Sequence, residues 1–271
     1  MLAYRILKTP FFGKFRKPWT FPRAENPQDW QPLQIASGSR ARLACLFGAA
    51  HGTPAAGNVL LAHPMGSEAK GFFLRDGHAR FLRDNGFNVL LFDFNGFGES
   101  EEGNFGYVED VLAAGRELRR LAPGLPTAVF GSSFGGAWAL CSLARADHGF
   151  SVAVFESVFT SLKEYWGRFP VANAVLTALS ALLPELERSL RPIAQVGMLR
   201  GVRKVVFLYG DGDRWTPLEM GTRLFESCNL DRADRVLWTM AGARHAQAFA
   251  TSSAEWRERY LKFLREALAA A

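Results

Sequence analysis

The chain has 271 residues, of which 48% are hydrophobic and 21% charged, and its formal net charge is +6. This length and apolar content allow one large hydrophobic core or two small ones and exclude a disordered chain. No apolar stretch reaches the roughly 20 residues that span a bilayer. The three cysteines are widely spaced and form no C-x-x-C pair, which argues against a metal site or a disulfide framework. We therefore expect a cytoplasmic protein without a secretory signal.

Residues 1–32 form an N-terminal arm rich in basic and aromatic residues. Several basic residues precede the first acidic residue, Glu25, and aromatic residues lie among or beside them. They include Arg5, Lys8, Lys14, Arg16 and Lys17, with Phe11, Phe12, Phe15 and Trp19. Such an arm either touches anionic lipid or nucleic acid, or packs its aromatic residues on the domain while its lysines face water. We favour the packed strap, keep a weak, peripheral membrane-surface contact as the alternative, and consider nucleic-acid binding unlikely.

From residue 33 to 271, apolar segments alternate with helical patterns. Segments 33–36 and 41–47 flank a Ser-Gly-Ser turn and predict a β-hairpin. Runs that are apolar at nearly every position predict strands buried on both faces, as in a parallel sheet, and one more strand follows them. These strands span 58–62, 88–92, 127–130, 151–155, 204–209 and 235–240. Helices are predicted over 69–85, 106–121, 133–146, 218–228 and 246–269, so the order indicates one doubly wound α/β domain.

One insertion, from about residue 159 to 203, breaks this alternation. It contains no strand pattern and has the length of two or three short helices, including an amphipathic one over 171–183. We expect a small helical cap over the sheet edge where ligands bind in such domains. Its apolar residues form either ordinary core or the wall of an acyl pocket, and the pattern favours neither.

A candidate nucleophile lies between the strand 127–130 and the helix that follows. The sequence from Gly131 to Gly135 reads G-S-S-F-G, which places a glycine two positions before and two positions after Ser133. A sharp strand-to-helix turn needs small residues at both places, and Ser132 would have Phe130 at one of them. Ser133 is therefore the predicted nucleophile, and it needs a base to take its proton and a carboxylate to orient that base.

The predicted base is His245. In a strand-turn-helix site of this kind the acid and the base follow the serine along the chain, which leaves two histidines. His148 ends the same predicted helix as Ser133, about 20 Å away at ~1.5 Å rise per residue. His245 lies after the last strand and before the last helix. This order favours His245.

Three carboxylates are candidates for the acid. Asp211 and Asp213 follow the strand 204–209, and Glu156 follows the strand 151–155. Asp213 lies past the glycine-rich turn and just before a helix start near Pro217, a suitable position for reaching His245. Asp211 would instead hold the turn through a side-chain to backbone hydrogen bond.

The oxyanion of the tetrahedral intermediate needs two backbone N–H donors. Phe134, directly after the nucleophile, should supply one. The other should come from the loop His63-Pro64-Met65-Gly66 after the strand 58–62. Since proline has no N–H, Met65 is the predicted donor, and His63 is predicted to brace this loop.

Together these motifs resemble the α/β-hydrolase superfamily of serine hydrolases over about residues 33–269. The loop after the strand 58–62 resembles its HGxx oxyanion loop, residues 93–100 resemble its D-x-x-G-x-G-x-S loop, and Gly210 to Pro217 is similar to its G-x-x-D-x-x-x-P acid loop. The resemblance implies an α/β-hydrolase fold with a mostly parallel eight-stranded sheet, a helical cap, and Asp213 as the acid. Residues 156–162 and the short cap look most like the Bem46-like or ABHD13-like branch.

The residues and the resemblance predict a serine hydrolase that cleaves carboxylic esters of short to medium acyl chain through an acyl-enzyme. The predicted triad is Ser133, Asp213 and His245, with no metal or organic cofactor. The partner is a small-molecule ester; the oligomeric state is left unpredicted. A thioesterase, amidase or peptidase would use the same triad, and a non-catalytic binding protein on this fold is a further alternative.

Overall fold

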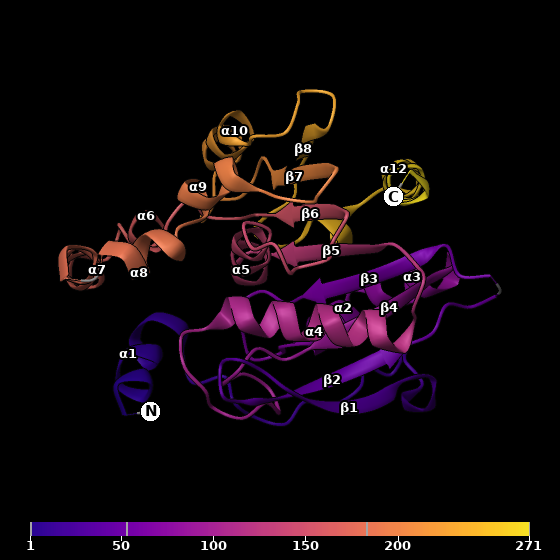
Figure 1. Ribbon diagram of the computed structural model, residues 1–271, viewed down its shortest axis with the longest axis horizontal. Coiled ribbons are helices and arrows are strands. Elements are labelled where there is room, and N and C mark those ends of the chain that lie inside the picture. The colour runs from indigo at the N-terminus through magenta and orange to yellow at the C-terminus, as the bar shows by residue number, and fades with distance from the viewer. Residues whose placement is uncertain (1, 53, 183, 271) are drawn as a thin grey trace.

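A central sheet of eight strands organises the computed structural model, which describes residues 2–52, 54–182 and 184–270 (Figure 1). The strand order is β1-β2-β4-β3-β5-β6-β7-β8. β1 pairs with β2 and β2 with β4 in antiparallel fashion, and all other neighbours are parallel. The strands are β1 (Gln31–Ala36), β2 (Arg42–Gly48), β3 (Gly57–Ala62), β4 (Phe87–Phe92), β5 (Thr127–Ser132), β6 (Val152–Glu156), β7 (Lys204–Gly210) and β8 (Arg235–Met240). The mostly parallel eight-stranded sheet is confirmed.

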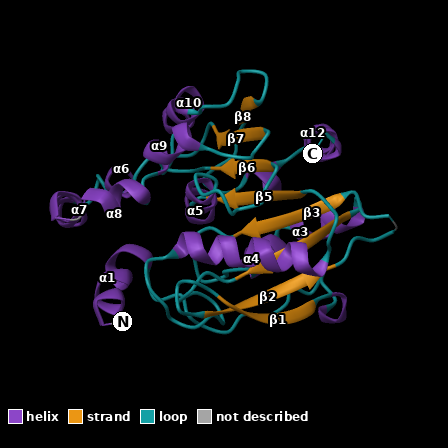
Figure 2. Cartoon of the chain, in the orientation of Figure 1, coloured by secondary structure: helices purple, strands orange, loops and turns teal. Residues whose placement is uncertain are grey.

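Helices flank the sheet on both faces (Figure 2). Those of the arm and the main layers are α1 (Leu2–Phe12), α2 (Gly71–Arg75), α3 (His78–Asp84), α4 (Tyr107–Leu121), α5 (Phe134–Ser142), α10 (Leu218–Ser227), α11 (Ala248–Thr251) and α12 (Ala254–Ala269). Successive strand side chains point to opposite faces, so Leu60 of β3 packs in the core under α4, α5 and α10, and Leu61 in the core under α2, α3 and α12.

Two of the predicted helices are each divided into two. The pattern over 69–85 forms α2 and α3, separated at Gly77, whose φ of 78° lies in the left-handed region that glycine tolerates. The pattern over 246–269 forms α11 and α12, because Ser252 and Ser253 are extended and the Ser253 side chain caps α12 by accepting from the Trp256 N–H. The helix predicted over 133–146 ends at Ser142.

Between β6 and β7 the chain forms more elements than the two or three helices predicted. These are α6 (Leu162–Tyr165), α7 (Pro170–Leu182), α8 (Pro184–Ser189), α9 (Pro192–Gln195) and the 3₁₀ turn η2 (Val196–Met198); another 3₁₀ turn, η1 (Pro27–Asp29), precedes β1. In Figure 1, α1 and α6–α8 lie at the end of the sheet to which the parallel strands point. The carboxyl ends of parallel strands are where ligands bind in open α/β sheets.

The N-terminal arm begins with the helix α1, and its lysines differ in exposure. Phe11 and Phe12 are buried, and Lys14 is exposed. The prediction that the lysines face water is wrong for Lys8, which is buried. Its Nζ donates to the carbonyls of Gly13, at 2.9 Å, and Gly96, at 2.8 Å, and these hydrogen bonds replace those with water. Burial lowers the pKa of Lys8 to about 8.

Across the three ranges that the structure describes, no helix has the length and apolar content needed to cross a bilayer.

Candidate active site

Ser133 lies between β5 and α5 with a backbone conformation that L residues rarely adopt, φ 49° and ψ −113°. The two flanking glycines are needed because other backbone comes very close. A Cβ on Gly131 would lie 2.6 Å from the Cα of Gly136, and one on Gly135 would lie 2.2 Å from the carbonyl oxygen of Ala62. The strand, the turn and the helix therefore have the geometry of a nucleophile elbow, with Ser133 at its apex.

Three side chains from separate loops meet at this apex. The Ser133 Oγ lies 2.7 Å from Nε2 of His245, and Nδ1 of His245 lies 2.9 Å from Oδ2 of Asp213. The imidazole thus has a carboxylate on one nitrogen and the hydroxyl on the other. This arrangement allows a histidine to take a proton from a serine while the carboxylate holds the ring in one tautomer.

The Asp213 carboxylate is held by further hydrogen bonds. Its Oδ1 accepts from the N–H groups of Trp215, at 2.8 Å, and Thr216, at 3.0 Å, and its Oδ2 accepts from the Thr216 hydroxyl at 2.6 Å. Burial would raise its pKa, but the hydrogen bond and charge of His245, together with the Thr216 donors, outweigh burial and lower the pKa to about 2. Asp213 is therefore ionised at neutral pH.

The two other candidate carboxylates have different partners. Asp211 is exposed, and its Oδ1 accepts from the N–H of Gly242 at 2.7 Å, which ties the end of β7 to the loop that carries His245. Glu156 is buried, and its Oε1 accepts from the N–H of Ala248 at 2.7 Å. Neither carboxylate takes the place beside the imidazole that Asp213 occupies.

The predicted oxyanion donors lie beside Ser133. Met65 and Phe134 line the same small pocket as the serine, with a volume of about 200 Å³ including its open mouth. Phe134 is the first residue of α5, so its N–H has no acceptor within the helix. The remaining lining residues are Phe12, Phe159, Leu162, Tyr165 and Trp166.

His63 braces the loop that carries Met65. Its Nε2 accepts from the N–H of Phe94 at 3.1 Å, so the proton is on Nδ1, which donates to the carbonyl of Pro64 at 2.7 Å. Burial lowers the pKa of His63 to about 4, which keeps the ring neutral. Both ring nitrogens of His148 have backbone partners, since its Nδ1 accepts from the N–H of Phe150 at 2.8 Å and its Nε2 contacts the carbonyl of Arg200.

Three neighbours of the site were given no role from the sequence, although Thr216 and Ser157 lie within the motifs described above. Thr216 contacts both Asp213 and His245, with its hydroxyl 3.2 Å from Nδ1 of the imidazole. Ser157, with φ 53°, accepts through its Oγ from the N–H of Ala246 at 3.3 Å and so supports the loop of His245. Phe12 reaches the pocket from the N-terminal helix. The contacts of Ser157 and Phe12 join segments far apart in the chain, so no spacing rule indicates them, whereas Thr216 contacts Asp213 three residues away in the same loop.

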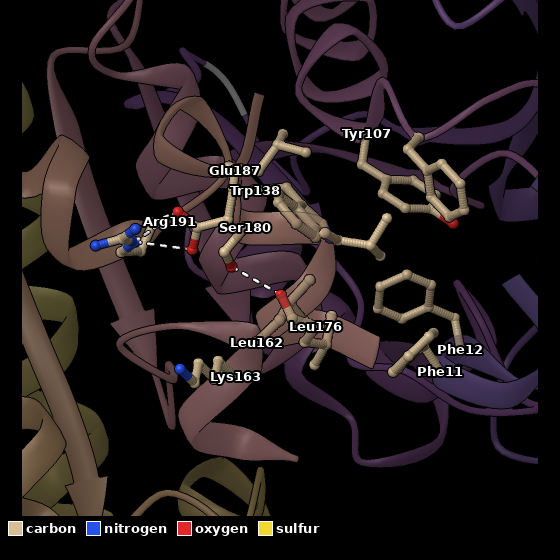
Figure 3. A pocket seen from close by; sticks show the side chains of 13 residues that line it. Phe11, Phe12, Tyr107, Trp138, Leu162, Lys163, Leu176, Ser180, Glu187 and Arg191 are labelled. Carbon is tan, nitrogen blue, oxygen red and sulfur yellow. Dashed lines mark hydrogen bonds and ion pairs between the residues drawn. The ribbon is translucent and has the colours of Figure 1, made fainter. Parts of the chain in front are cut away.

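A larger apolar cavity adjoins this pocket, between α1 and the helices α6–α8 (Figure 3). Its volume is about 930 Å³, including its open mouth. It shares two of its lining residues, Phe12 and Leu162, with the pocket at Ser133. Within the described part of the chain, no three His, Cys, Asp or Glu residues gather as a metal site requires.

The sequence matches a known protein family over part of its length. The model of the serine aminopeptidase family S33 (Hydrolase_4) matches residues 53–198, which is more than half of the chain. The chain belongs to this family. The matched residues of this S33 member include Met65, Ser133 and Phe134 and end before Asp213 and His245. The S33 family is part of the α/β-hydrolase superfamily, so the resemblance in the sequence is confirmed at that level.

Solved structures share the fold of this S33 member. The esterase Pf2001 of Pyrococcus furiosus is similar with a TM-score of 0.71 and 20% identity, over 94% of this chain and 98% of that one. Dipeptidyl peptidase 4 of Porphyromonas gingivalis is similar with a TM-score of 0.64 and 14% identity, over 88% of this chain and 35% of that one. At these identities the likeness establishes the α/β-hydrolase fold.

A curated relative is similar in sequence. The uncharacterized protein YfhR of Escherichia coli K12 is 26% identical over 194 residues, which is 69% of this chain and 64% of YfhR. The match therefore spans less than two thirds of the relative's length.

Proposed function

We propose that the protein is a serine hydrolase that cleaves carboxylic esters with an apolar acyl group of short to medium length. The observation that carries this proposal is the line of hydrogen bonds from Asp213 through His245 to the Ser133 hydroxyl, which ends in a small apolar pocket. A serine in this setting is a nucleophile, and a pocket of this lining suits a hydrocarbon group.

The reaction has two halves. The Ser133 Oγ attacks the ester carbonyl carbon while its proton passes to Nε2 of His245, and the oxyanion is held by the N–H groups of Met65 and Phe134. The C–O bond of the alcohol then breaks, and His245 gives its proton to the leaving oxygen. Water next attacks the acyl-enzyme, with His245 again as the base, and releases the acid and the free serine.

The lining of the Ser133 pocket favours an ester over the N-terminus of a peptide. Eight residues line it, and none is charged. Binding an α-ammonium group there would leave a cation in an apolar pocket without a carboxylate partner, which costs free energy. A thioester or an uncharged amide would fit as well, so a panel of substrates is needed to compare the bonds.

Replacing the nucleophile tests the proposal directly. Ser133→Ala should lower kcat for p-nitrophenyl esters by about 10⁶-fold and abolish labelling by a fluorophosphonate, because the attacking oxygen is lost. Ser132→Ala is the matched control, since Ser132 is the buried neighbour in the same turn. Parallel assays with acyl thioesters and anilides identify the preferred bond. Labelling that persists in Ser133→Ala would assign the chemistry to another residue.

We also propose that the protein belongs to the Bem46-like or ABHD13-like branch of the superfamily. We propose further that it works in the reducing cytoplasm. Residues 156–162, read as E-S-V-F-T-S-L, and the short cap support the branch. The cysteines Cys45, Cys141 and Cys228 are free and buried, which suits a reducing compartment. The same proposal divides the chain into an arm of residues 1–32 and a hydrolase domain of residues 33–271, with the cap at about 159–203.

A weak contact with an anionic membrane surface completes the proposal. The arm exposes Lys14, Arg16 and Lys17. The cap helix α7 has no charged residue and exposes aliphatic side chains, with Val171 at 79% and Leu182 at 75% of full exposure. Basic residues attract anionic lipid, and exposed aliphatic side chains enter the interface.

Charge reversal tests this contact better than deletion, because the arm also carries buried aromatic residues. Changing Lys14, Arg16 and Lys17 to Glu should weaken binding to phosphatidylglycerol vesicles at least about tenfold in co-sedimentation, at roughly 1 kcal/mol per basic residue. The matched control reverses three exposed basic residues of α12, namely Arg259, Lys262 and Arg265. Equal binding by both triple variants would contradict a role for the arm.

A further inference from the structure

The small pocket at Ser133 and the large apolar cavity have a common wall. Phe12 of α1 and Leu162 of α6 line both of them. Including their open mouths, the pocket has a volume of about 200 Å³ and the cavity one of about 930 Å³. A hydrocarbon chain that starts at Ser133 therefore meets Phe12 and Leu162 before it reaches the larger space.

Phe12 is held firmly in this wall. Its side chain is buried, and its ring packs against Phe134 with centroids 5.4 Å apart and against Tyr107 with centroids 5.7 Å apart. Phe134 directly follows the nucleophile in the chain. The ring of Phe12 is thus positioned by one residue of the site, Phe134, and one of the cavity, Tyr107, although both are about 100 residues away along the chain.

The cavity behind this wall suits an aliphatic chain. Its lining is mostly aliphatic and aromatic, with Phe11, Phe105, Tyr107, Trp138, Leu176, Leu179 and Leu190. Two of its three charged residues, Glu187 and Arg191, pair with each other through their side chains, and the third, Lys163, is exposed. In Figure 3 the aromatic side chains of α1 and Tyr107 lie on one side of the cavity and the Glu187–Arg191 pair on the other. No unpaired buried charge is present in this lining to demand a polar ligand.

We propose that Phe12 is the residue that limits acyl length at Ser133, because its ring separates the small pocket from the large apolar cavity. With the aromatic ring in place, the acyl group ends in the small pocket. With a small side chain at position 12, the acyl chain passes into the cavity and binds along its apolar lining. This inference rests on the proposed esterase function and adds the element that sets its specificity.

The residue that closes the pocket comes from α1, at the N-terminal end of the described chain. Residue 12 lies outside residues 53–198, which match the S33 family. The contact with the site follows from α1 packing against Phe105, Tyr107 and Phe134. The N-terminal arm therefore contributes a specificity-determining residue in addition to its exposed basic groups.

The test is an acyl-length profile with p-nitrophenyl esters from acetate to palmitate. For Phe12→Ala we expect the ratio of kcat/KM for laurate to kcat/KM for butyrate to rise at least about tenfold, since each added methylene in an apolar site contributes measurably to binding. The rise in kcat/KM for laurate should come mainly from a lower KM. A contact that binds substrate and transition state equally changes KM and leaves kcat unchanged. Phe11→Ala is the matched control, because Phe11 lines the cavity and not the Ser133 pocket. It should retain the wild-type preference for butyrate over laurate.

The experiment separates a failure of the inference about Phe12 from a failure of the proposed esterase function. An unchanged length profile in a folded Phe12→Ala variant, beside an active wild type, would overturn this inference and leave the esterase proposal standing. A wild type that hydrolyses no ester of the series would overturn the proposed function instead. If Phe12→Ala does not fold, Leu162→Ala opens the same wall from the cap side and should shift the profile in the same direction.

Discussion

Asp213→Asn should lower kcat by about 10⁴-fold, because an amide beside the imidazole favours the wrong tautomer and no longer stabilises the imidazolium. The Asp213 side chain is fully buried, and its Oδ2 faces Nδ1 of His245 at 2.9 Å. Because its pKa is about 2, the Asp213 carboxylate is charged at neutral pH. Its substitution therefore removes a charge that is present during every turnover.

Asp211→Asn is the matched control, two residues away in the same loop. Asp211 is exposed and accepts one hydrogen bond, from the Gly242 N–H, which the amide oxygen of asparagine also accepts. We expect its kcat to stay within about threefold of the wild type, as for most surface substitutions. The measurement is steady-state hydrolysis of p-nitrophenyl butyrate, with circular dichroism to establish that each variant folds. If Asp211→Asn lowered kcat more than Asp213→Asn does, Asp211 would be the acid of the triad.

Lys70→Met should reduce the free energy of unfolding by about 3–5 kcal/mol, the usual cost of removing one partner of a buried ion pair. The Nζ of Lys70 lies 2.6 Å from Oδ2 of Asp93 and 2.6 Å from Oε2 of Glu99. The side chains of Lys70 and Asp93 are 1% and 0% exposed. Without the lysine, the Asp93 carboxylate would remain buried with no cation beside it, and burying an unpaired charge is costly.

Urea denaturation at neutral pH measures this loss. Lys163→Met is the control, since Lys163 is exposed and its replacement should change the free energy of unfolding by less than about 0.5 kcal/mol. The double variant Lys70→Met with Asp93→Asn should recover part of the loss, because no uncompensated charge is left behind. A loss in Lys70→Met no larger than that of the control would show that water reaches Asp93 and screens its charge.

The arm also takes part in this ion-pair cluster. The indole N–H of Trp19 donates to Oε2 of Glu99 at 2.9 Å, and the Nζ of Lys70 lies 5.0 Å from the centre of a Trp19 ring. An amine over an aromatic face is stabilised by the negative face of the ring. Trp19 of the arm therefore covers this buried ion-pair cluster.

Local patterns predicted the strands of this protein well. Strands such as β3 and β5 are buried on both faces, so they read as continuous apolar runs, and their observed ends differ from the predicted ones by at most two residues. Divided helices were harder to predict, because the pattern over 69–85 continues through Gly77 while the backbone does not. Hydrophobic periodicity reports which face is buried and says little about a single φ angle.

By itself, the sequence determined the α/β order of elements, the turn around Ser133 and the position of His245 after the last strand, since each depends on residues close together in the chain. The sequence also favoured Asp213 over Asp211, and the structure adds their contacts, since Asp213 faces His245 and Asp211 accepts from the Gly242 N–H. Only the tertiary structure decided that Phe12 lies beside Ser133 and that Lys8 is buried. These are contacts between distant segments, and their geometry arises from the packing of the whole fold.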